Sequence, residues 1–212
     1  MGGPPGDVID LLDWKRRVFE LYRQIRVAPK PAEAWEAWRR ARDHLFATHP
    51  QSPVPKGKRQ SFTGLPYFDY DPAARVLAAV REAAPETYDI ATSGEAGGSY
   101  RFSRFALASF DLDGRPLELE LYWLEGYGGG LFVPFRDATS GRETYGAGRY
   151  LLDTVKGADL GMEDERLVLD FNFAYNPSCA YDPAWVCPLA PPPNRLGVPI
   201  RAGERYGADL RR

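Results

Sequence analysis

The spacing of apolar residues changes once along the chain, and this change constrains the fold more than any other feature. Up to residue 48, apolar side chains recur every three or four positions, as they do on a helix with one buried face. Three prolines follow within residues 49–55, and proline lacks the amide hydrogen that a continuing helix needs. Farther along the chain, apolar and polar residues alternate, as on strands with one buried face. The sequence therefore predicts a helical start and a β-strand body.

Two helices are expected before this proline-rich connector. Asp7 can cap the first helix, whose apolar stripe ends near Val27. Two prolines follow, and the second of them, Pro31, suits the first turn of another helix that carries Trp35 and Trp38 on one face. The pair is predicted to form a helical hairpin that packs against the rest of the protein.

Two strands with a tight turn between them give the clearest β-sheet pattern. Residues 100–105 and 117–123 alternate between two faces, and Asp113-Gly114 between them tolerates the positive φ angles of a two-residue hairpin turn. These two strands should therefore pair antiparallel. Further strands are expected at residues 88–92, 130–135, 149–154 and 167–173.

The connections between these strands are too short to carry the crossover helices of a parallel sheet. We therefore expect an α+β, mainly β fold, with an antiparallel sheet curled into a barrel or sandwich and the helical hairpin packed on it. The proline-rich residues 183–199 predict an irregular C-terminal strap. Residues 1–212 are expected to form a single domain, with a helical segment at 1–50 and the antiparallel β body at 60–212.

Charge and composition narrow the range of partners. The net charge is −2 and the basic residues are scattered, so we expect no nucleic-acid partner. The longest apolar runs fall far short of the roughly 20 residues that cross a bilayer, and the first ten residues do not resemble a secretion signal. The two cysteines, Cys179 and Cys187, are too few for a disulfide-based secreted fold. A soluble, cytoplasmic protein without a membrane partner is expected.

The sequence gives little support for a metal site or a catalytic nucleophile. Cys179, Cys187, His44 and His49 lack the closely spaced pairs that are typical of zinc sites, so no metal is expected. Structural roles near a helix end are favoured for both histidines. A catalytic cysteine needs a base and a positive environment, which the sequence does not reveal, so buried unreactive thiols are expected. Whether the two cysteines pair is left open, and no catalytic residue or cofactor is identified.

The densest polar stretch covers residues 125–151. Its glycines at positions 126 and 128–130 do not have phosphate-loop spacing and precede a strand instead of a helix, so a glycine-rich bend is favoured. The segment Arg-Asp-Ala-Thr-Ser-Gly at 136–141 can satisfy its own turn through Asp137. Alternatively, its side chains converge with later ones around a pocket, where arginine binds a carboxylate or phosphate.

A second polar cluster lies in residues 170–181. Asp170 and Asn172 are expected on one face of a strand, opposite three apolar residues and just before an Asn-Pro turn at Asn176. This face is either ordinary solvent-exposed surface or the mouth of a ligand pocket. The candidate ligand-binding residues of the two clusters are Arg136, Asp137, Thr139, Glu143, Tyr145, Arg149, Asp170, Asn172 and Asn176.

These motifs resemble those of a known protein family. The run Pro-Phe-Arg-Asp-Ala-Thr-Ser-Gly at 134–141, the run Leu-Asp-Phe-Asn-Phe-Ala-Tyr-Asn-Pro-Ser-Cys-Ala-Tyr at 169–181, and Ala-Gly-Glu at 202–204 are similar to the bacterial and archaeal family called domain of unknown function 1684 (DUF1684), in its short form. The resemblance covers about the C-terminal half of the chain. It implies a shared architecture and a shared polar site, and it implies no activity, substrate or cofactor.

Three functional hypotheses from different classes follow. The leading one is the binding of a small polar or anionic ligand in a pocket formed by the two motifs, with enzyme activity left open. The alternative is a structural or interaction module, a homodimer, whose motifs only brace turns. A weaker alternative is a flavin- or pyridoxal-binding barrel, which rests on analogy with the expected topology.

Overall fold

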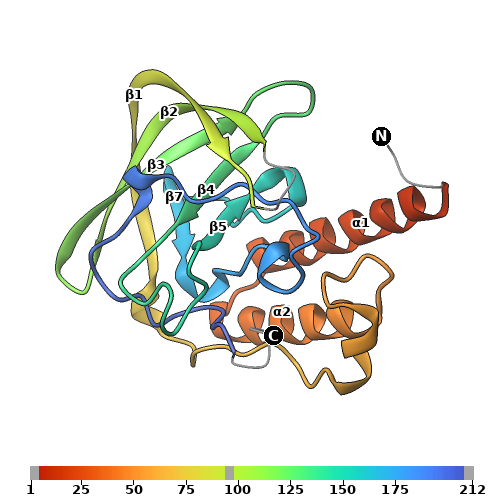
Figure 1. Ribbon diagram of the computed structural model, residues 1–212. Helices are drawn as coiled ribbons and strands as arrows, with labels where there is room; N and C mark the ends of the chain where they lie inside the picture. The colour runs from red at the N-terminus through yellow and green to blue at the C-terminus, as the bar shows by residue number, and fades with distance from the viewer. Residues whose placement is uncertain (1–4, 94–97, 208–212) are drawn as a thin grey trace.

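A single curled antiparallel sheet forms the body of the protein (Figure 1). The computed structural model describes residues 5–93 and 98–207. The strands are β1 (Arg75–Ala91), β2 (Ser99–Leu112), β3 (Arg115–Leu124), β4 (Leu131–Phe135), β5 (Arg149–Asp153), β6 (Met162–Glu163) and β7 (Arg166–Asp170). Their order in the sheet is β5-β4-β3-β2-β1-β7-β6, and every neighbouring pair is antiparallel. The predicted mainly β, antiparallel architecture is confirmed.

The sheet curls without closing into a barrel. β5 and β6 form its two edges, and no pairing among the described residues joins them. The register shifts between β1 and β2, between β2 and β3, and between β4 and β5, and such irregularities bend and twist strands. The expected barrel or sandwich therefore fits this open, curled sheet only loosely.

The hairpin predicted from Asp113-Gly114 is present between β2 and β3. Both residues have positive φ angles, 52° and 71°, as a tight two-residue turn requires. The strands pair from Leu112 with Arg115 up to Phe102 with Leu124. In this hairpin the local turn residues set the antiparallel register.

Two strands have limits that the alternation pattern did not predict. β1 begins at Arg75, whereas the sequence predicted a strand only at 88–92, because charged residues in its middle are exposed and interrupt the alternation. β7 ends at Asp170, and Phe171–Phe173 form a 3-10 turn. The Asp170 carboxylate accepts the backbone amide of Asn172 at 3.0 Å and so ends the strand. The prediction that these two side chains share one strand face was therefore wrong.

The helical hairpin is formed by α1 (Pro5–Val27) and α2 (Pro31–Thr48), which lie next to each other on one side of the sheet (Figure 1). Trp38 is fully buried, with its ring 5.2 Å from that of Phe173. The indole nitrogen of Trp35 donates to the carbonyl oxygen of Asn172 at 2.9 Å. The two predicted tryptophans thus join α2 to the end of β7. Neither helix in the described part of the chain combines the length and apolar character needed to span a membrane.

The predicted C-terminal strap at 183–199 forms no strand, and the chain continues in the same irregular way to residue 205, so that we use the name strap for residues 183–205. Asn194 is fully buried in the strap and donates to the carbonyl oxygens of Glu120 at 3.0 Å and Pro134 at 2.8 Å. It also accepts the amide of Glu120 at 2.8 Å. The Asn194 side chain therefore anchors the strap to the sheet, because it forms hydrogen bonds with the backbone of β3 and β4 that a neighbouring strand would otherwise form.

We predict that Gly203→Ala lowers the free energy of unfolding by at least about 2 kcal/mol. Gly203 has a φ of 76°, and an added Cβ would lie 2.6 Å from the carbonyl oxygens of Phe171 and Ala174. Gly197→Ala, in the same strap, is the matched control, because its Cβ meets no atom within 4 Å and it should change stability by less than about 0.5 kcal/mol. Urea unfolding of both variants measures the difference, and equal effects would contradict the prediction.

Candidate functional site

The polar side chains around residues 137–149 form a buried network centred on one ion pair. Arg149 donates from Nη2 to Asp137 Oδ2 at 2.7 Å, and both side chains are at most 1% exposed. Asp137 Oδ1 accepts the backbone amide of Thr139 at 2.6 Å, so this turn is closed by its own residues. Thr139 Oγ1 lies 2.8 Å from Thr144 Oγ1. The segment therefore satisfies most of its polar groups internally.

The strap supplies further partners for Arg149. Its Nη2 donates to the carbonyl oxygen of Ile200 at 2.9 Å, and Nη1 donates to the carbonyl oxygens of Ala202 and Glu204. Burial lowers the pKa of Arg149, while the adjacent Asp137 carboxylate opposes this shift. Both terminal nitrogens of the guanidinium are thus occupied by groups of the protein itself, whereas the buried Nε has no hydrogen-bond partner.

A second buried network surrounds the carboxylate of Glu204, which is fully buried. Arg42 Nη2 donates to Oε2 at 2.7 Å, and Asn176 donates to both oxygens, from its backbone and side-chain nitrogens, at 3.1 Å each. The hydroxyl of Tyr181 donates to Oε1. Burial raises the pKa of Glu204, and the Arg42 charge opposes that shift. This network connects α2, the segment after β7 and the strap.

A third group lies where α2 meets the end of β7. Asp170 Oδ1 accepts the side-chain Nδ2 of Asn172 at 2.8 Å as well as its backbone amide. Asn172 in turn pairs with the backbone of Asp71, donating at 2.8 Å and accepting at 2.9 Å. Burial raises the pKa of Asp170 to about 6, although the hydrogen bonds from Asn172 act to lower it. These contacts fix the chain direction after β7.

The three remaining candidate residues are less buried. Glu143 accepts from Arg201 at 3.0 Å across the surface. The hydroxyl of Tyr145 lies 3.7 Å from Cys179 Sγ. The backbone amide of Arg136 donates to the strap at 2.9 Å.

The structure distributes the candidate residues over separate groups. One contains the side chains around 137–149, another contains Asn176 with Glu204, and a third contains Asp170 with Asn172. The first two groups meet at the strap, because Arg149 donates to the carbonyl oxygen of Glu204 at 3.3 Å. Direct contact of these residues with a ligand stays a prediction.

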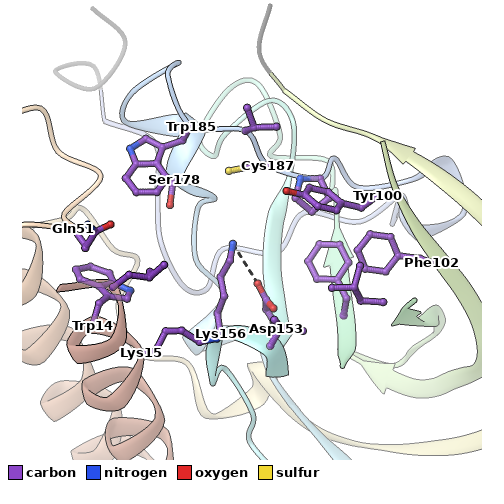
Figure 2. Close-up of a pocket in the computed structure, with 16 residues that line it drawn as sticks. Trp14, Lys15, Gln51, Tyr100, Phe102, Asp153, Lys156, Ser178, Trp185 and Cys187 are labelled. Carbon is purple, nitrogen blue, oxygen red and sulfur yellow. Dashed lines mark ion pairs between the residues drawn. The ribbon is translucent and has the colours of Figure 1, made fainter. Parts of the chain in front are cut away.

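A cavity of about 390 Å³ opens where the helical hairpin, one end of the sheet and the strap meet (Figure 2). Figure 2 shows Trp14 and Trp185 on one side, with Tyr100 and Phe102 opposite them. We call this space the aromatic cavity. Its apolar lining residues are Leu11, Trp14, Tyr100, Phe102, Leu124, Phe132, Val155, Trp185, Val186 and Pro188, and its polar ones are Lys15, Gln51, Asp153, Lys156, Ser178 and Cys187.

Two of the three charged groups of the aromatic cavity, Asp153 and Lys156, lie at the end of β5, and the third, Lys15, lies on α1. The Asp153 side chain is 8% exposed, and Lys156 Nζ lies 3.6 Å from its Oδ2, as the dashed line in Figure 2 marks. Burial raises the pKa of Asp153, and the charges of Lys156 and Lys15 oppose the shift. Two lysines and one aspartate thus line the cavity, an excess of one positive charge when all three are ionised.

The aromatic cavity was missed by reasoning from the sequence. The nine candidate residues, all within the described part of the chain, lie outside its lining. Its walls come from α1, the strand ends near β2 to β5, and two parts of the chain after β7. Cys187 and the strands that carry Tyr100, Phe132 and Asp153 were named from the sequence, but nothing in the local pattern indicated that these residues meet.

The histidines and cysteines do not form a metal site. Among residues 5–93 and 98–207, no three His, Cys, Asp or Glu side chains are grouped so that they could hold a metal ion. His49 Nε2 lies 3.1 Å from Asp13 Oδ2, and its Nδ1 accepts the amide of Gln51 at 3.1 Å. This histidine therefore joins α1 to the connector after α2.

Comparisons with known proteins locate the chain in a family. The family model described as "Protein of unknown function (DUF1684)" matches residues 60–205. Among solved structures, the chain is similar to an uncharacterised protein of Haloarcula marismortui whose solution structure was determined by NMR. The two are 40% identical, the match covers 84% of this chain and 94% of that chain, and the TM-score is 0.59. The chain matches none of the curated proteins. The resemblance inferred from the motifs is confirmed.

We predict that Asp137→Asn destabilises the protein by about 3–5 kcal/mol, because it leaves the buried charge of Arg149 without its counterion. Glu143→Gln is the matched control in the same segment, since its pair with Arg201 is exposed and should contribute less than about 1 kcal/mol. Urea unfolding measures both changes. If both variants lose similarly little stability, the buried pair of Asp137 and Arg149 does not hold this region together.

We also predict a pH dependence that arises from Asp170. Its pKa is raised from 3.8 to about 6 in the folded protein, so the folded state binds this proton more tightly than the unfolded chain. Stability should therefore fall by roughly 3 kcal/mol from this group as the pH rises from about 4 to above 6. Asp170→Asn keeps an acceptor oxygen and should remove this part of the dependence. Denaturant unfolding at several pH values checks it, and parallel profiles for the two proteins would refute it.

Proposed function

This chain belongs to the DUF1684 family, and we propose that it binds, in the aromatic cavity, a small amphipathic molecule that carries an anionic group. The observation that carries the proposal is the combination of aromatic walls with Lys15 and Lys156 in one cavity. It narrows the small polar or anionic ligand expected from the sequence to a ligand with an apolar body.

The size and lining of the cavity support a small-molecule ligand. Its volume of about 390 Å³ falls within the range of roughly 300–1,000 Å³ in which proteins enclose small molecules. Phe102 and Phe132 are buried and stacked, with ring centroids 5.1 Å apart, and they form a rigid part of the wall. Tyr100 is 45% exposed, so its ring is available at the entrance. An apolar or aromatic body would therefore find a preformed surface.

The lysines support an anionic group on that ligand. Figure 2 shows the amino group of Lys156 inside the cavity, directed toward Asp153. The Lys156 side chain is 55% exposed, so its amino group can reach a ligand as well as the aspartate. Lys15 brings a second positive charge from α1. A carboxylate, sulfonate or phosphate placed between these lysines would gain charge-assisted hydrogen bonds.

We assign the nine candidate residues of the two motifs a supporting role in this proposal. Tyr145 touches Cys179, and the backbone amide of Cys179 donates to Cys187 Sγ in the cavity lining at 3.4 Å. The networks of Arg149 and Asn176 hold the strap, which also supplies Trp185 to the cavity. The motifs would thus shape the cavity without contacting its ligand.

Flavin and pyridoxal cofactors belong to this ligand class, because each combines an aromatic ring with an anionic phosphate. The third hypothesis drawn from the sequence is therefore a special case of the proposal. An absorption spectrum of the protein after incubation with flavin mononucleotide or pyridoxal phosphate, followed by desalting, separates these two from other ligands.

Self-association is a second candidate function. The first half of α1 exposes apolar side chains, including Ile9 at 63% and Val8 at 48%. Apolar groups gathered on one exposed segment favour a protein partner, and a second copy of the chain is the simplest one. Light scattering would then give twice the chain mass of 23.7 kDa. We further propose a cytoplasmic location, based on the low cysteine content, which cell fractionation tests.

The ligand proposal predicts that one molecule of 8-anilinonaphthalene-1-sulfonate binds per chain. This probe has an aromatic body and one anionic group. Replacing both lysines, Lys15→Gln with Lys156→Gln, should raise its Kd about tenfold, which corresponds to the loss of one charge-assisted hydrogen bond. The uncharged analogue N-phenyl-1-naphthylamine should bind the variant and the parent protein alike. Fluorescence titration measures both affinities.

Lys30→Gln provides the matched control, because this lysine is 68% exposed and lies outside the cavity lining. It should change neither affinity, and circular dichroism should show the same fold for every variant. An equal loss of affinity for both probes in the double variant would contradict the proposed anion site. Failure of both probes to bind the parent protein would overturn the ligand proposal itself.

A further inference from the structure

Two free thiols lie together beside the aromatic cavity. Cys179 belongs to a 3-10 turn (Ser178–Ala180), and Cys187 lies in the strap. The backbone amide of Cys179 donates to Cys187 Sγ at 3.4 Å, so this sulfur rests against the backbone of the other cysteine. A disulfide needs such proximity, because its two Cα atoms lie about 4.4–6.8 Å apart.

Neighbouring groups hold the two cysteines in place. Cys187 donates its amide to Ser93 Oγ at 3.0 Å and accepts the amide of Ser93 at its carbonyl oxygen at 2.9 Å. The hydroxyl of Tyr145 lies 3.7 Å from Cys179 Sγ. Contacts from β1's end, the 137–149 segment and the strap therefore converge on this pair.

The pair is polarised, so that one sulfur becomes a thiolate more readily than the other. A hydrogen bond from the Cys187 thiol, helped by Ser93 and Tyr145 and opposed by burial, lowers the pKa of Cys179 to about 6. The same hydrogen bond, with burial, raises the pKa of Cys187. At pH 7, a thiol with a lowered pKa is ionised to a greater extent than a free cysteine.

Small molecules can approach the pair through the cavity. Cys187 belongs to the lining, and Figure 2 shows its sulfur between Ser178 and Tyr100. Cys179 is 9% exposed and directly follows Ser178, another lining residue. An oxidant of the size of hydrogen peroxide would therefore enter where the ligand is expected to bind.

We propose that Cys179 and Cys187 form a reactive dithiol that a hydroperoxide oxidises to an intramolecular disulfide. The Cys179 thiolate attacks the terminal peroxide oxygen, the O–O bond breaks, and the alcohol or water leaves with a proton from solvent. Cys187 then attacks the resulting sulfenic acid, its thiol proton joins the departing hydroxide, and water leaves. Two electrons pass from the two sulfurs to the peroxide. A small dithiol reduces the disulfide back to the starting pair.

Oxidation would act on the cavity wall. The disulfide closes a loop from 179 to 187, and this loop carries Trp185 and Val186, which line the cavity. Formation of the disulfide itself does not depend on which molecule the cavity binds. The inference therefore stands or falls separately from the proposed function.

The test uses the full-length protein and hydrogen peroxide. After a short exposure and alkylation with N-ethylmaleimide in denaturant, mass spectrometry should show a chain that has lost two hydrogens and carries no maleimide. Dithiothreitol should restore two alkylated cysteines. Two alkylated thiols after exposure, or disulfide-linked dimers alone, would overturn the proposal.

Cysteine variants assign the two roles. Cys187→Ser should stop the reaction at a sulfenic acid on Cys179, which dimedone traps, whereas Cys179→Ser should react at least about tenfold more slowly at pH 7. Equal rates for the two variants would contradict the assigned order. The measurement on the parent protein decides the proposal even if either variant fails to fold.

Tyr145→Phe tests the positioning of the thiolate. Removing this hydroxyl should move the midpoint of the iodoacetamide alkylation profile of Cys179 from near pH 6 to a higher pH, without loss of the fold. A merely structural tyrosine would change thermal stability and leave that midpoint in place, which would contradict its assigned role.

Discussion

The structure depends on the neutralisation of charges that the fold removes from water. An ionised group in the interior is stable only when its hydrogen bonds and its counterion are supplied by the protein. Glu204 receives Arg42 from α2, and Arg149 receives Asp137 together with carbonyl oxygens of the strap. Arg42 and Glu204 are 162 residues apart in sequence, and Arg149, only 12 residues from Asp137, reaches the strap 51 residues away through the carbonyl oxygen of Ile200. The helical hairpin, the edge strand β5 and the strap are therefore held in one arrangement by two buried ion pairs.

The sequence predicted the features that local spacing determines. The change of apolar period located the helices and most strands, and Asp113-Gly114 located a hairpin, because these signals arise between residues close in the chain. The end of β7 was misplaced because a hydrogen bond from the backbone amide of Asn172 to the Asp170 carboxylate competes with strand pairing. Periodicity contains no information about such a competition.

The candidate site was harder to predict because its partners are distant in sequence. Asp137 and Asn176 were recognised as members of polar clusters, but the groups that they contact include strap residues up to Glu204. A cluster that binds its own chain and a cluster that binds a ligand have the same local composition. The aromatic cavity is lined by residues from many short segments, so no single stretch of the sequence indicates it.

The boundary of the family match divides the aromatic cavity. Asp153 and Lys156 fall within residues 60–205, whereas Trp14 and Lys15 belong to α1, which precedes the matched region. Most of the lining thus comes from the part of the chain that the family model matches, and α1 adds Leu11, Trp14 and Lys15 from before it. A difference in α1 between relatives would alter what the cavity accepts and leave the sheet intact.

The strap also determines the order in which parts of the chain can complete their folding. The carbonyl oxygens that receive Arg149 belong to residues 200–204, and these are synthesised about fifty residues after the arginine itself. Until the strap has been synthesised, Arg149 has Asp137 as its counterion but lacks the carbonyl oxygens that complete its buried hydrogen bonds. Completion of this sheet edge therefore waits for the strap, and until then chaperones would encounter an unfinished edge strand.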